Sequence, residues 1–253
     1  MSENYFGEDV AARYDDDLGE LGNPETIEAA AEFLAELAAG GAALELGVGT
    51  GRIALPLSAR GVRVAGLDLS EAMVARLRAK SGGDAITVVI GDFATTRVEW
   101  TFSLAYVVFN TIMNLRTQEA QVACFENVAR HLEGGGCFVA EIMLPELQRL
   151  SPGERFLPFE VSPEHLGFDE YDVVQQRLTS HHYYPAEATY STFPGRYIWP
   201  AELDLMARIA GMRLRERWSN WARSPIHSRE RQAHLRLGEA VGRSAGPVFG
   251  NDP

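Results

Sequence analysis

An apolar run that ends in three alternating glycines, Gly47, Gly49 and Gly51, constrains this chain more than any other feature. Residues 43–46 have the composition of a buried strand, and the glycines after them indicate a tight turn that leads at once into a helix. Backbone N–H groups at such a turn come close to a ligand, and the new helix directs the positive end of its dipole toward it. The pattern therefore predicts a nucleotide-type binding site at the end of this strand.

The spacing of the glycines restricts the ligand. A dinucleotide-binding turn has two residues between its second and third glycines. Here a single residue separates each glycine from the next, and an acid, Glu45, lies inside the strand. Both departures disfavour a pyrophosphate, so a nicotinamide-dependent oxidoreductase is the weaker interpretation of this strand, turn and helix.

The next predicted strands bring polar side chains to the same edge of a parallel sheet. The second strand ends in Asp68, whose carboxylate is placed to accept both hydroxyls of a ribose. The third ends before Asp92 and Phe93, an acid and a ring that suit the amino group and the face of an adenine. The fourth delivers Asn110, which can orient a ligand but is a poor base. A turn residue that bonds its own backbone is the alternative interpretation of Asn110.

In this order, the run Glu45–Gly51, the strand-ending Asp68 and the pair Asp92–Phe93 resemble the class I S-adenosylmethionine-dependent methyltransferases of the small-molecule type. The resemblance covers residues 23–143 and, more weakly, residues 199–218. It implies an α/β, Rossmann-like fold: a seven-stranded sheet of order 3-2-1-4-5-7-6, with the last strand antiparallel and helices on both faces. S-adenosyl-L-methionine is the implied cofactor, lying across the carboxyl ends of the first four strands.

The residue types and the resemblance together give a set of expected cofactor contacts. These are Tyr14, Glu45, Gly47, Gly49, Gly51, Asp68, Leu69, Asp92, Phe93 and Asn110.

The balance of charge disfavours a nucleic acid partner. The formal net charge is −12, the isoelectric point is near 5.0, and no dense basic run offsets them. Part of the acidity is local, as in the run Asp15–Asp17, which we interpret as solvated surface. A protein of this net negative charge slightly favours a basic amine as the acceptor.

Cys124 and Cys137 are too few and too isolated for a disulfide framework or a metal site, so we expect no metal. No apolar run has the length of about 18 residues that a membrane-spanning helix needs, and residues 1–5 lack the apolar core of a signal peptide. We therefore expect a cytoplasmic protein with no membrane partner. The sequence leaves the oligomeric state unknown.

Residues 5–22 carry Tyr5, Phe6, Arg13 and Tyr14 among acids and glycines. The segment is too polar for a core helix and too aromatic for a terminal tail that makes no contacts. In the resembling methyltransferases the amino-terminal segment folds over the cofactor. The resemblance therefore implies a lid in which Tyr14 or Arg13 touches the cofactor. Packing on the domain surface is the alternative.

A cap over the acceptor pocket is expected from residues 145–199. Its first part, as far as residue 170, is rich in proline, glycine and acids and predicts an irregular excursion. Residues 171–184 and 188–199 favour β-forming side chains and predict an antiparallel hairpin.

Four side chains of this hairpin are candidates for contact with the acceptor. Tyr183 and Tyr197 are expected to supply apolar walls with hydroxyls for orientation. His181 and His182 are weak candidates for a general base. Because neighbours on a strand point to opposite faces, at most one of the two histidines can face the pocket. Packed or exposed histidines are the alternative.

The distal part of the chain completes a single domain of residues 1–253. Residues 212–218 predict the sixth strand, and the seventh is expected near residues 232–237, although that stretch is more polar than a buried strand.

Methyl transfer from a sulfonium depends mainly on alignment, because the donor is already activated by its positive charge. A base is optional when the acceptor is a neutral amine. The sequence thus predicts S-adenosylmethionine-dependent methyl transfer to a small molecule, at an N, O or C atom that it does not specify. A cofactor-binding protein without transferase activity, and a protein or RNA methyltransferase, remain as alternatives.

Overall fold

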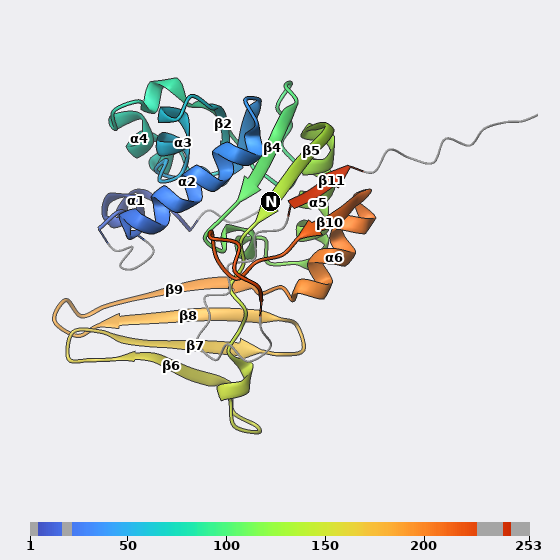
Figure 1. Ribbon diagram of the computed structural model, residues 1–253. Coiled ribbons are helices and arrows are strands. Elements are labelled where there is room, and N and C mark those ends of the chain that lie inside the picture. Colours follow the sequence, from blue (N-terminus) through green and yellow to red (C-terminus); the bar gives the residue numbers. More distant parts are fainter. Residues whose placement is uncertain (1–4, 17–21, 227–239, 244–253) are drawn as a thin grey trace, which may run out of the picture.

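The computed structural model describes residues 5–16, 22–226 and 240–243, and within them the strands form two sheets (Figure 1). The larger sheet has seven strands in the spatial order β10-β11-β5-β4-β1-β2-β3. Their bounds are β1 Ala42–Leu46, β2 Arg63–Asp68, β3 Thr87–Ile90, β4 Phe102–Val107, β5 Leu132–Ala140, β10 Met212–Glu216 and β11 Ala240–Arg243.

The predicted topology of the seven-stranded sheet is confirmed. Strands β3, β2, β1, β4 and β5 are parallel to their neighbours. Strand β11 lies between β5 and β10 and is antiparallel to both. This is the order 3-2-1-4-5-7-6 with the last strand reversed. The last strand lies at Ala240–Arg243, further along the chain than expected, and residues 232–237 fall outside the described part of the structure.

Helices cover both faces of this sheet, and several begin at a side-chain cap that is evident in the sequence. The longer helices are α2 Pro24–Ala38, α4 Glu71–Ala79, α5 Gln118–His131 and α6 Pro200–Ile209, and the shorter ones are α1 Glu8–Arg13 and α3 Ala54–Ala59. Asn23, Ser70 and Thr117 accept hydrogen bonds from the first turns of α2, α4 and α5. Each cap satisfies a backbone N–H that would otherwise lack a partner.

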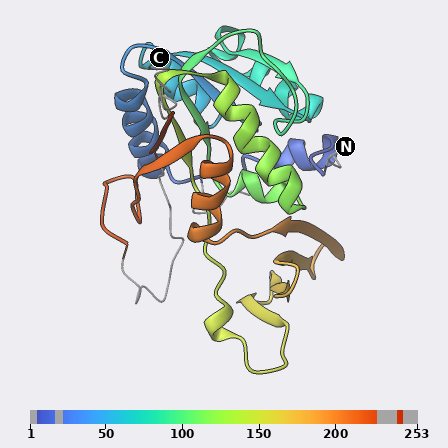
Figure 2. The same cartoon turned by 90° about the vertical axis from the view of Figure 1, so that its right-hand side faces the viewer.

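The core lies in two layers because successive side chains of a buried strand point to opposite faces. On one face, α2, α3 and α4 pack on alternate residues of the strands, such as Ala43 and Leu104. On the other face, α5 and α6 pack on the residues between them, such as Leu44 and Ala105. In Figure 2, α5 and α6 lie in front of the seven-stranded sheet, and a second sheet lies below it.

The second sheet, which we call the cap sheet, is antiparallel and has the order β6-β7-β8-β9. Its strands are β6 Phe156–Val161, β7 Leu166–Asp172, β8 Arg177–Tyr184 and β9 Thr189–Arg196. The predicted hairpin is confirmed as β8 and β9. The expectation of an irregular excursion up to residue 170 is wrong, since β6 and most of β7 lie there. Strand β6 is an outer strand that contains Pro158 and a bulge after it, and outer strands tolerate both features.

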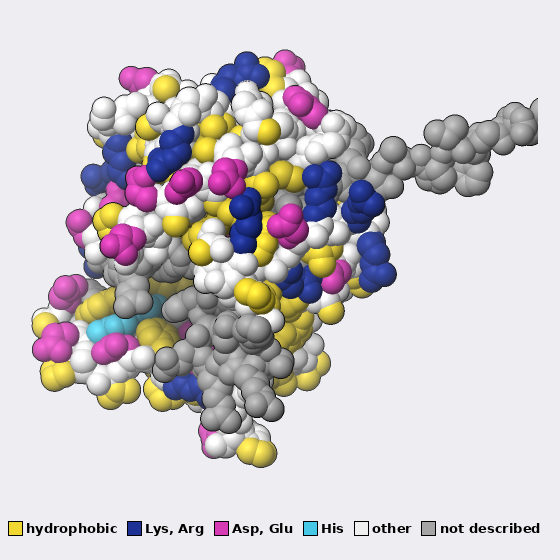
Figure 3. Space-filling model, viewed as in Figure 1, with side chains coloured by type: hydrophobic (Ala, Val, Ile, Leu, Met, Phe, Trp, Pro, Cys, Tyr) yellow, Lys and Arg dark blue, Asp and Glu magenta, His cyan; other side chains and the backbone are white. Residues whose placement is uncertain are grey.

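One face of the cap sheet is turned toward the larger sheet. A Cβ added at Gly195 of β9 would lie 3.3 Å from Met113, in the 3₁₀ helix η3 Thr111–Asn114 that follows β4. Gly195 pairs with Leu178 on β8. Paired antiparallel residues share a face and alternate residues follow them, so Ser180, His182 and Phe193 also belong to this inner face. Figure 3 shows histidine and hydrophobic side chains on the cap sheet in a hollow below the larger sheet, with acids nearby.

A buried ion pair joins the cap sheet to the larger sheet. Arg196, at the end of β9, contacts Glu202 of α6 at 2.7 Å and donates a hydrogen bond of 2.5 Å to Gln121 of α5. The Arg196 and Glu202 side chains are only 6% and 12% exposed. The end of β9 is therefore attached to α5 and α6, which pack on the seven-stranded sheet.

Candidate active site

The three glycines form the predicted turn, and each has a positive φ, at 74°, 52° and 80°. Glycine adopts this backbone region without the penalty that a Cβ brings. A Cβ at Gly47 would lie 2.3 Å from the Thr111 side chain, so the turn after β1 packs closely against η3. At Gly51 it would lie 3.0 Å from Leu77. Gly47 and Gly49 line the cavity described below, whereas Gly51 allows α4 to pack closely against the turn.

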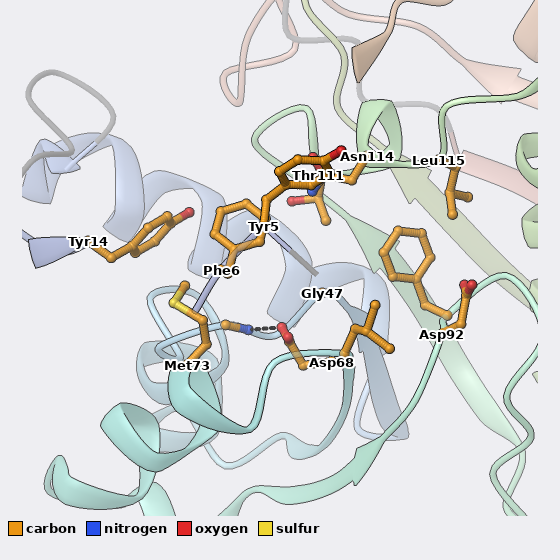
Figure 4. A pocket seen from close by; sticks show the side chains of 13 residues that line it. Tyr5, Phe6, Tyr14, Gly47, Asp68, Met73, Asp92, Thr111, Asn114 and Leu115 are labelled. Carbon is orange, nitrogen blue, oxygen red and sulfur yellow. Dashed lines mark hydrogen bonds between the residues drawn. The ribbon is translucent and has the colours of Figure 1, made fainter. Parts of the chain in front are cut away.

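A cavity opens where β1, β2, β3 and β4 end (Figure 4). It is lined by Tyr5, Phe6, Tyr14, Gly47, Gly49, Asp68, Leu69, Met73, Asp92, Phe93, Thr111, Asn114 and Leu115.

Two carboxylates define the polarity of this cavity. Asp68 accepts hydrogen bonds from the backbone N–H groups of Gly49 at 2.6 Å and Ser70 at 2.8 Å. Burial raises the pKa of Asp68, and these backbone hydrogen bonds oppose the shift. Asp92 accepts from the N–H of Ala94 at 2.9 Å. No Lys or Arg is among the described residues that line the cavity, so it suits ribose hydroxyls and an adenine better than a phosphate.

A second, smaller cavity continues from the first along the glycine turn. Tyr14, Gly47, Gly49 and Thr111 line both cavities, and Glu45 and Arg52 line the second. Glu45 is almost completely buried and accepts a hydrogen bond of 2.9 Å from the Tyr106 hydroxyl. Burial raises its pKa to about 8, although Tyr106 and Arg52 act in the opposite direction.

Arg52 is held beside this second cavity by an aromatic ring. Its guanidinium lies 3.5 Å from the centre of the Phe109 ring, a cation–π contact. Burial lowers the pKa of Arg52, and the nearby acidic groups of Tyr14, Glu45, Glu141 and Asp15 oppose the shift. The second cavity therefore offers a cation and a weakly acidic carboxyl within one small space.

The amino-terminal segment forms one wall of the first cavity. The rings of Phe6 and Tyr14 meet edge to face, with centroids 6.0 Å apart. Tyr5 lies against Arg116, whose guanidinium carbon is 5.1 Å from the ring centre. Figure 4 shows all three rings around the cavity, opposite Asp68 and Asp92. Residues 17–21 of the expected lid lie outside the described part of the structure.

Comparisons with known proteins agree with this geometry. A family model described as a methyltransferase domain matches residues 43–136, which span the glycine turn, Asp68 and Asp92. The CcbJ methyltransferase of Streptomyces caelestis, whose structure is known, is 36% identical, with a TM-score of 0.81 over 97% of this chain and 100% of that one. The chain belongs to the class I S-adenosylmethionine-dependent methyltransferases.

More distant structures share the fold of this methyltransferase. DesVI of Streptomyces venezuelae is 20% identical with a TM-score of 0.65, and the match covers 92% of this chain and 98% of that one. CalS10 of Micromonospora echinaspora, solved with S-adenosylmethionine bound, is 21% identical with a TM-score of 0.66, over 96% and 99%. A sequence comparison with curated proteins finds no match.

The cavities fit the cofactor of this family, S-adenosylmethionine. Seven expected contacts line the first cavity: Tyr14, Gly47, Gly49, Asp68, Leu69, Asp92 and Phe93. Glu45 lines the second. Gly51 and Asn110 line neither cavity. The contact roles of these ten residues stay predictions.

Asn110 lies just behind the cavity wall. It follows Phe109, and both adopt left-handed backbone conformations, with φ of 62° and 54°. Its side-chain oxygen is buried and has no hydrogen-bond partner among the described residues. Thr111 and Asn114, one and four residues later, line the first cavity instead.

The candidate acceptor residues of the methyltransferase are divided between the two faces of the cap sheet. Tyr197, just after β9, is fully buried in a cluster with Met113, Tyr171 and Leu178. Tyr183 lies on the outer face and is 37% exposed. Neither lines the cavities described above, so their contact with an acceptor stays a prediction.

The two histidines point to opposite faces of the cap sheet, as the alternation predicts. On the outer face, His181 stacks on Phe168 and lies 2.5 Å from the Tyr190 hydroxyl. On the inner face, His182 contacts Ser180 at 3.2 Å and His165 at 3.0 Å. Burial, with repulsion from the neighbouring histidines, lowers the pKa of His182. His182, on the inner face, is therefore the stronger of the two weak candidates for a general base, and this role stays a prediction.

The sequence interpretation missed several residues of the first cavity. Met73, Thr111, Asn114 and Leu115 line it, but no local pattern around them indicates contact with a ligand. Their positions depend on how α4 and η3 pack against the glycine turn.

In the described ranges, no cluster of three or more His, Cys, Asp or Glu could hold a metal ion. The described helices include none long and apolar enough to cross a membrane.

Proposed function

We propose that this protein transfers a methyl group from S-adenosylmethionine to a small molecule that lies between the first cavity and the inner face of the cap sheet. The observation that carries the proposal is the composition of the cavity at the ends of β1 to β4, which has two carboxylates and several rings but no basic lining residue in the described part. Such a cavity favours an uncharged adenosine over a phosphate-bearing nucleotide.

The donor set supports one orientation of the cofactor. Asp68 would accept the ribose hydroxyls, and Asp92 and Phe93 would hold the adenine by its amino group and its face. The amino acid part would then extend along Gly47 and Gly49 into the second cavity. When bound, the cofactor supplies a methyl group on a positively charged sulfur, which leaves alignment as the main task of the protein.

Enclosure of the site supports a small acceptor. The aromatic amino-terminal segment covers one side, and Arg13 of α1 approaches Glu187, in the turn between β8 and β9, at 4.0 Å. On the inner face of the cap sheet, Ser180, His182 and Phe193 offer hydroxyl, imidazole and ring contacts in a partly apolar setting, as ligand pockets usually do. CalS10 is described as an amino pentose methyltransferase and KedS8 as a sugar N-methyltransferase. At 21% and 18% identity these proteins share the fold alone.

Two further points belong to the proposal. The net charge of −12 disfavours binding of a nucleic acid. Cys124 and Cys137 are buried free thiols, which supports the cytoplasmic location expected from the sequence, where thiols stay reduced.

Calorimetric titration with S-adenosylhomocysteine tests the cofactor site. Asp68→Ala should weaken binding by about 1–3 kcal/mol, the scale of lost hydrogen bonds to a charged group. Asp84→Ala removes an acid outside both cavities and serves as the matched control. Unchanged affinity in Asp68→Ala, or tighter binding of a nicotinamide dinucleotide, would contradict the assignment.

A coupled assay for S-adenosylhomocysteine release, run against amines, phenols and sugars, tests the acceptor class. Turnover with at least one small molecule is expected. Methylation of proteins or RNA with no small-molecule turnover would favour the macromolecular alternative. Cofactor binding with no transfer to any acceptor would favour a binding protein.

A further inference from the structure

The amino-terminal strap, which we define as residues 5–16, is attached to the glycine turn through a single carboxylate. The Thr50 hydroxyl donates a hydrogen bond of 2.6 Å to Oδ1 of Asp15. The other oxygen, Oδ2, lies 2.7 Å from Nζ of Lys80, at the end of α4. Lys80 in turn donates a hydrogen bond of 3.0 Å to the backbone carbonyl of Thr50. Three separate segments thus meet in one closed set of contacts, which we call the latch.

The latch holds the part of the turn that faces the cavities. Thr50 lies between Gly49 and Gly51, is only 2% exposed, and uses both its hydroxyl and its carbonyl in the latch. The neighbouring Gly49 uses its N–H to bind Asp68. A movement of Asp15 would therefore release contacts on the same short turn that borders both cavities.

The latch also fixes Tyr14, the residue before Asp15. Tyr14 is the strap residue that lines both cavities, so its ring lies where they join. Burial raises the pKa of the Tyr14 phenol, and Arg52 opposes the shift. Two neighbours restrain Tyr14: its ring contacts Phe6 edge to face, and the next residue, Asp15, is held by Thr50 and Lys80.

A second attachment holds the other end of the strap. The Ser70 hydroxyl donates a hydrogen bond to the carbonyl of Phe6, and Tyr5 lies under Arg116. The strap therefore lies along the first cavity between its two attachments, with Tyr5, Phe6 and Tyr14 in the cavity wall (Figure 4). Opening of either attachment would free this wall of the cavity and give a bound ligand a path out.

We propose that Asp15 is a positioning residue which, through Thr50 and Lys80, keeps Tyr14 in the site and sets the rate at which bound cofactor leaves. This inference rests on the proposed position of the cofactor in the two cavities. The latch carboxylate is ionised at neutral pH: partial burial opposes ionisation, but hydrogen bonds from Lys80 and Thr50 outweigh it and lower the pKa of Asp15.

Stopped-flow measurement of S-adenosylhomocysteine binding tests the latch. Asp15→Ala should speed dissociation about five- to tenfold, the scale of one charge-assisted hydrogen bond at a partly exposed site. Association should be unchanged or faster, because an open strap does not obstruct entry. Asp15→Asn keeps an acceptor for Thr50 and should lie between wild type and Asp15→Ala. Glu28→Gln removes a carboxylate that pairs with Arg60 away from the cavities and should leave both rates unchanged.

A pair of variants at residue 50 separates the latch from general packing. Thr50→Ser keeps the donor hydroxyl and should dissociate at nearly the wild-type rate, whereas Thr50→Val keeps the shape and should resemble Asp15→Ala. Equal rates in the two variants, or a dissociation rate in Asp15→Ala within twofold of wild type, would overturn the proposal. If Asp68→Ala also leaves affinity unchanged, the cofactor position itself is at fault; if Asp68→Ala weakens binding as expected, only the latch is refuted.

Discussion

Replacement of Glu45 by Gln tests the electrostatics at the centre of the site. Burial raises the pKa of Glu45 to about 8 in the folded protein, against an ordinary value of 4.5. Between these two pH values the folded protein holds one more proton than the unfolded chain, in which this carboxyl is already ionised. A rise in pH through the window therefore favours the unfolded state, and the loss of stability is complete only above about pH 8.

The size of the effect follows from the width of the window. One pKa unit corresponds to about 1.4 kcal/mol, so the interval from 4.5 to about 8 sets an upper limit of about 5 kcal/mol. Glu45→Gln has no proton to lose, and its amide oxygen can still accept the hydrogen bond from Tyr106. We expect the free energy of unfolding of the variant, relative to wild type, to increase by a few kcal/mol as the pH rises through this window.

Urea unfolding of the ligand-free protein at a series of pH values measures this difference. Glu28→Gln is the matched control, because the Glu28 side chain is 59% exposed and pairs with Arg60 on the surface. Its stability difference should change little with pH. The reasoning about Glu45 is refuted if wild type and Glu45→Gln have parallel pH profiles.

Three further substitutions have matched controls in the same chain. Gly47→Ala should weaken S-adenosylhomocysteine binding far more than Gly61→Ala. Both substitutions place Ala at positive φ, but the new Cβ meets Thr111 at residue 47 and open space at residue 61. Equal affinities of the two variants in calorimetry would contradict this. Arg196→Met leaves Glu202 buried without its cation and should lower the free energy of unfolding in urea by about 3–5 kcal/mol. Arg223→Met breaks a pair with Glu36 whose side chains are 45% and 57% exposed, and should lower it by less than about 1 kcal/mol. Similar decreases in the two variants would argue against a stabilising role of the buried Arg196–Glu202 pair. Phe193→Ala on the inner face of the cap sheet should lower kcat/KM for the acceptor with cofactor affinity unchanged. Tyr183→Ala on the outer face is its comparison, and a loss of kcat/KM in Tyr183→Ala alone would favour the sequence prediction that Tyr183 forms the pocket wall.

The ends of the first three strands were predictable because their signals are local. Glycines at positive φ, an acid that ends a strand and an acid followed by a ring each state a requirement within a few residues. Asp68 and Asp92 therefore lie at the cavity as expected. The order of the strands came instead from the resemblance to a family, since nothing local specifies which strands become neighbours.

The cap sheet shows where local reasoning fails. The β-forming side chains of β8 and β9 predicted the hairpin, and the alternation of side chains along a strand placed His181 and His182 on opposite faces. This alternation does not determine which face is turned toward the larger sheet. That depends on the contact between Gly195 and Met113, residues far apart in the sequence. Asp15 is a similar case: in an acidic run it reads as solvated surface, and only the approach of Thr50 and Lys80 distinguishes it from its neighbours.

The two outer strands of the cap sheet each contain a proline, Pro158 in β6 and Pro194 in β9. A proline has no N–H to offer a new strand, and the bulge after Pro158 further disturbs the edge of β6. Another chain therefore cannot extend this sheet in a continuous ladder of backbone hydrogen bonds. The cap sheet can therefore stand out from the seven-stranded sheet with less tendency to template polymerisation, and its faces offer another protein a more regular surface than its edges do.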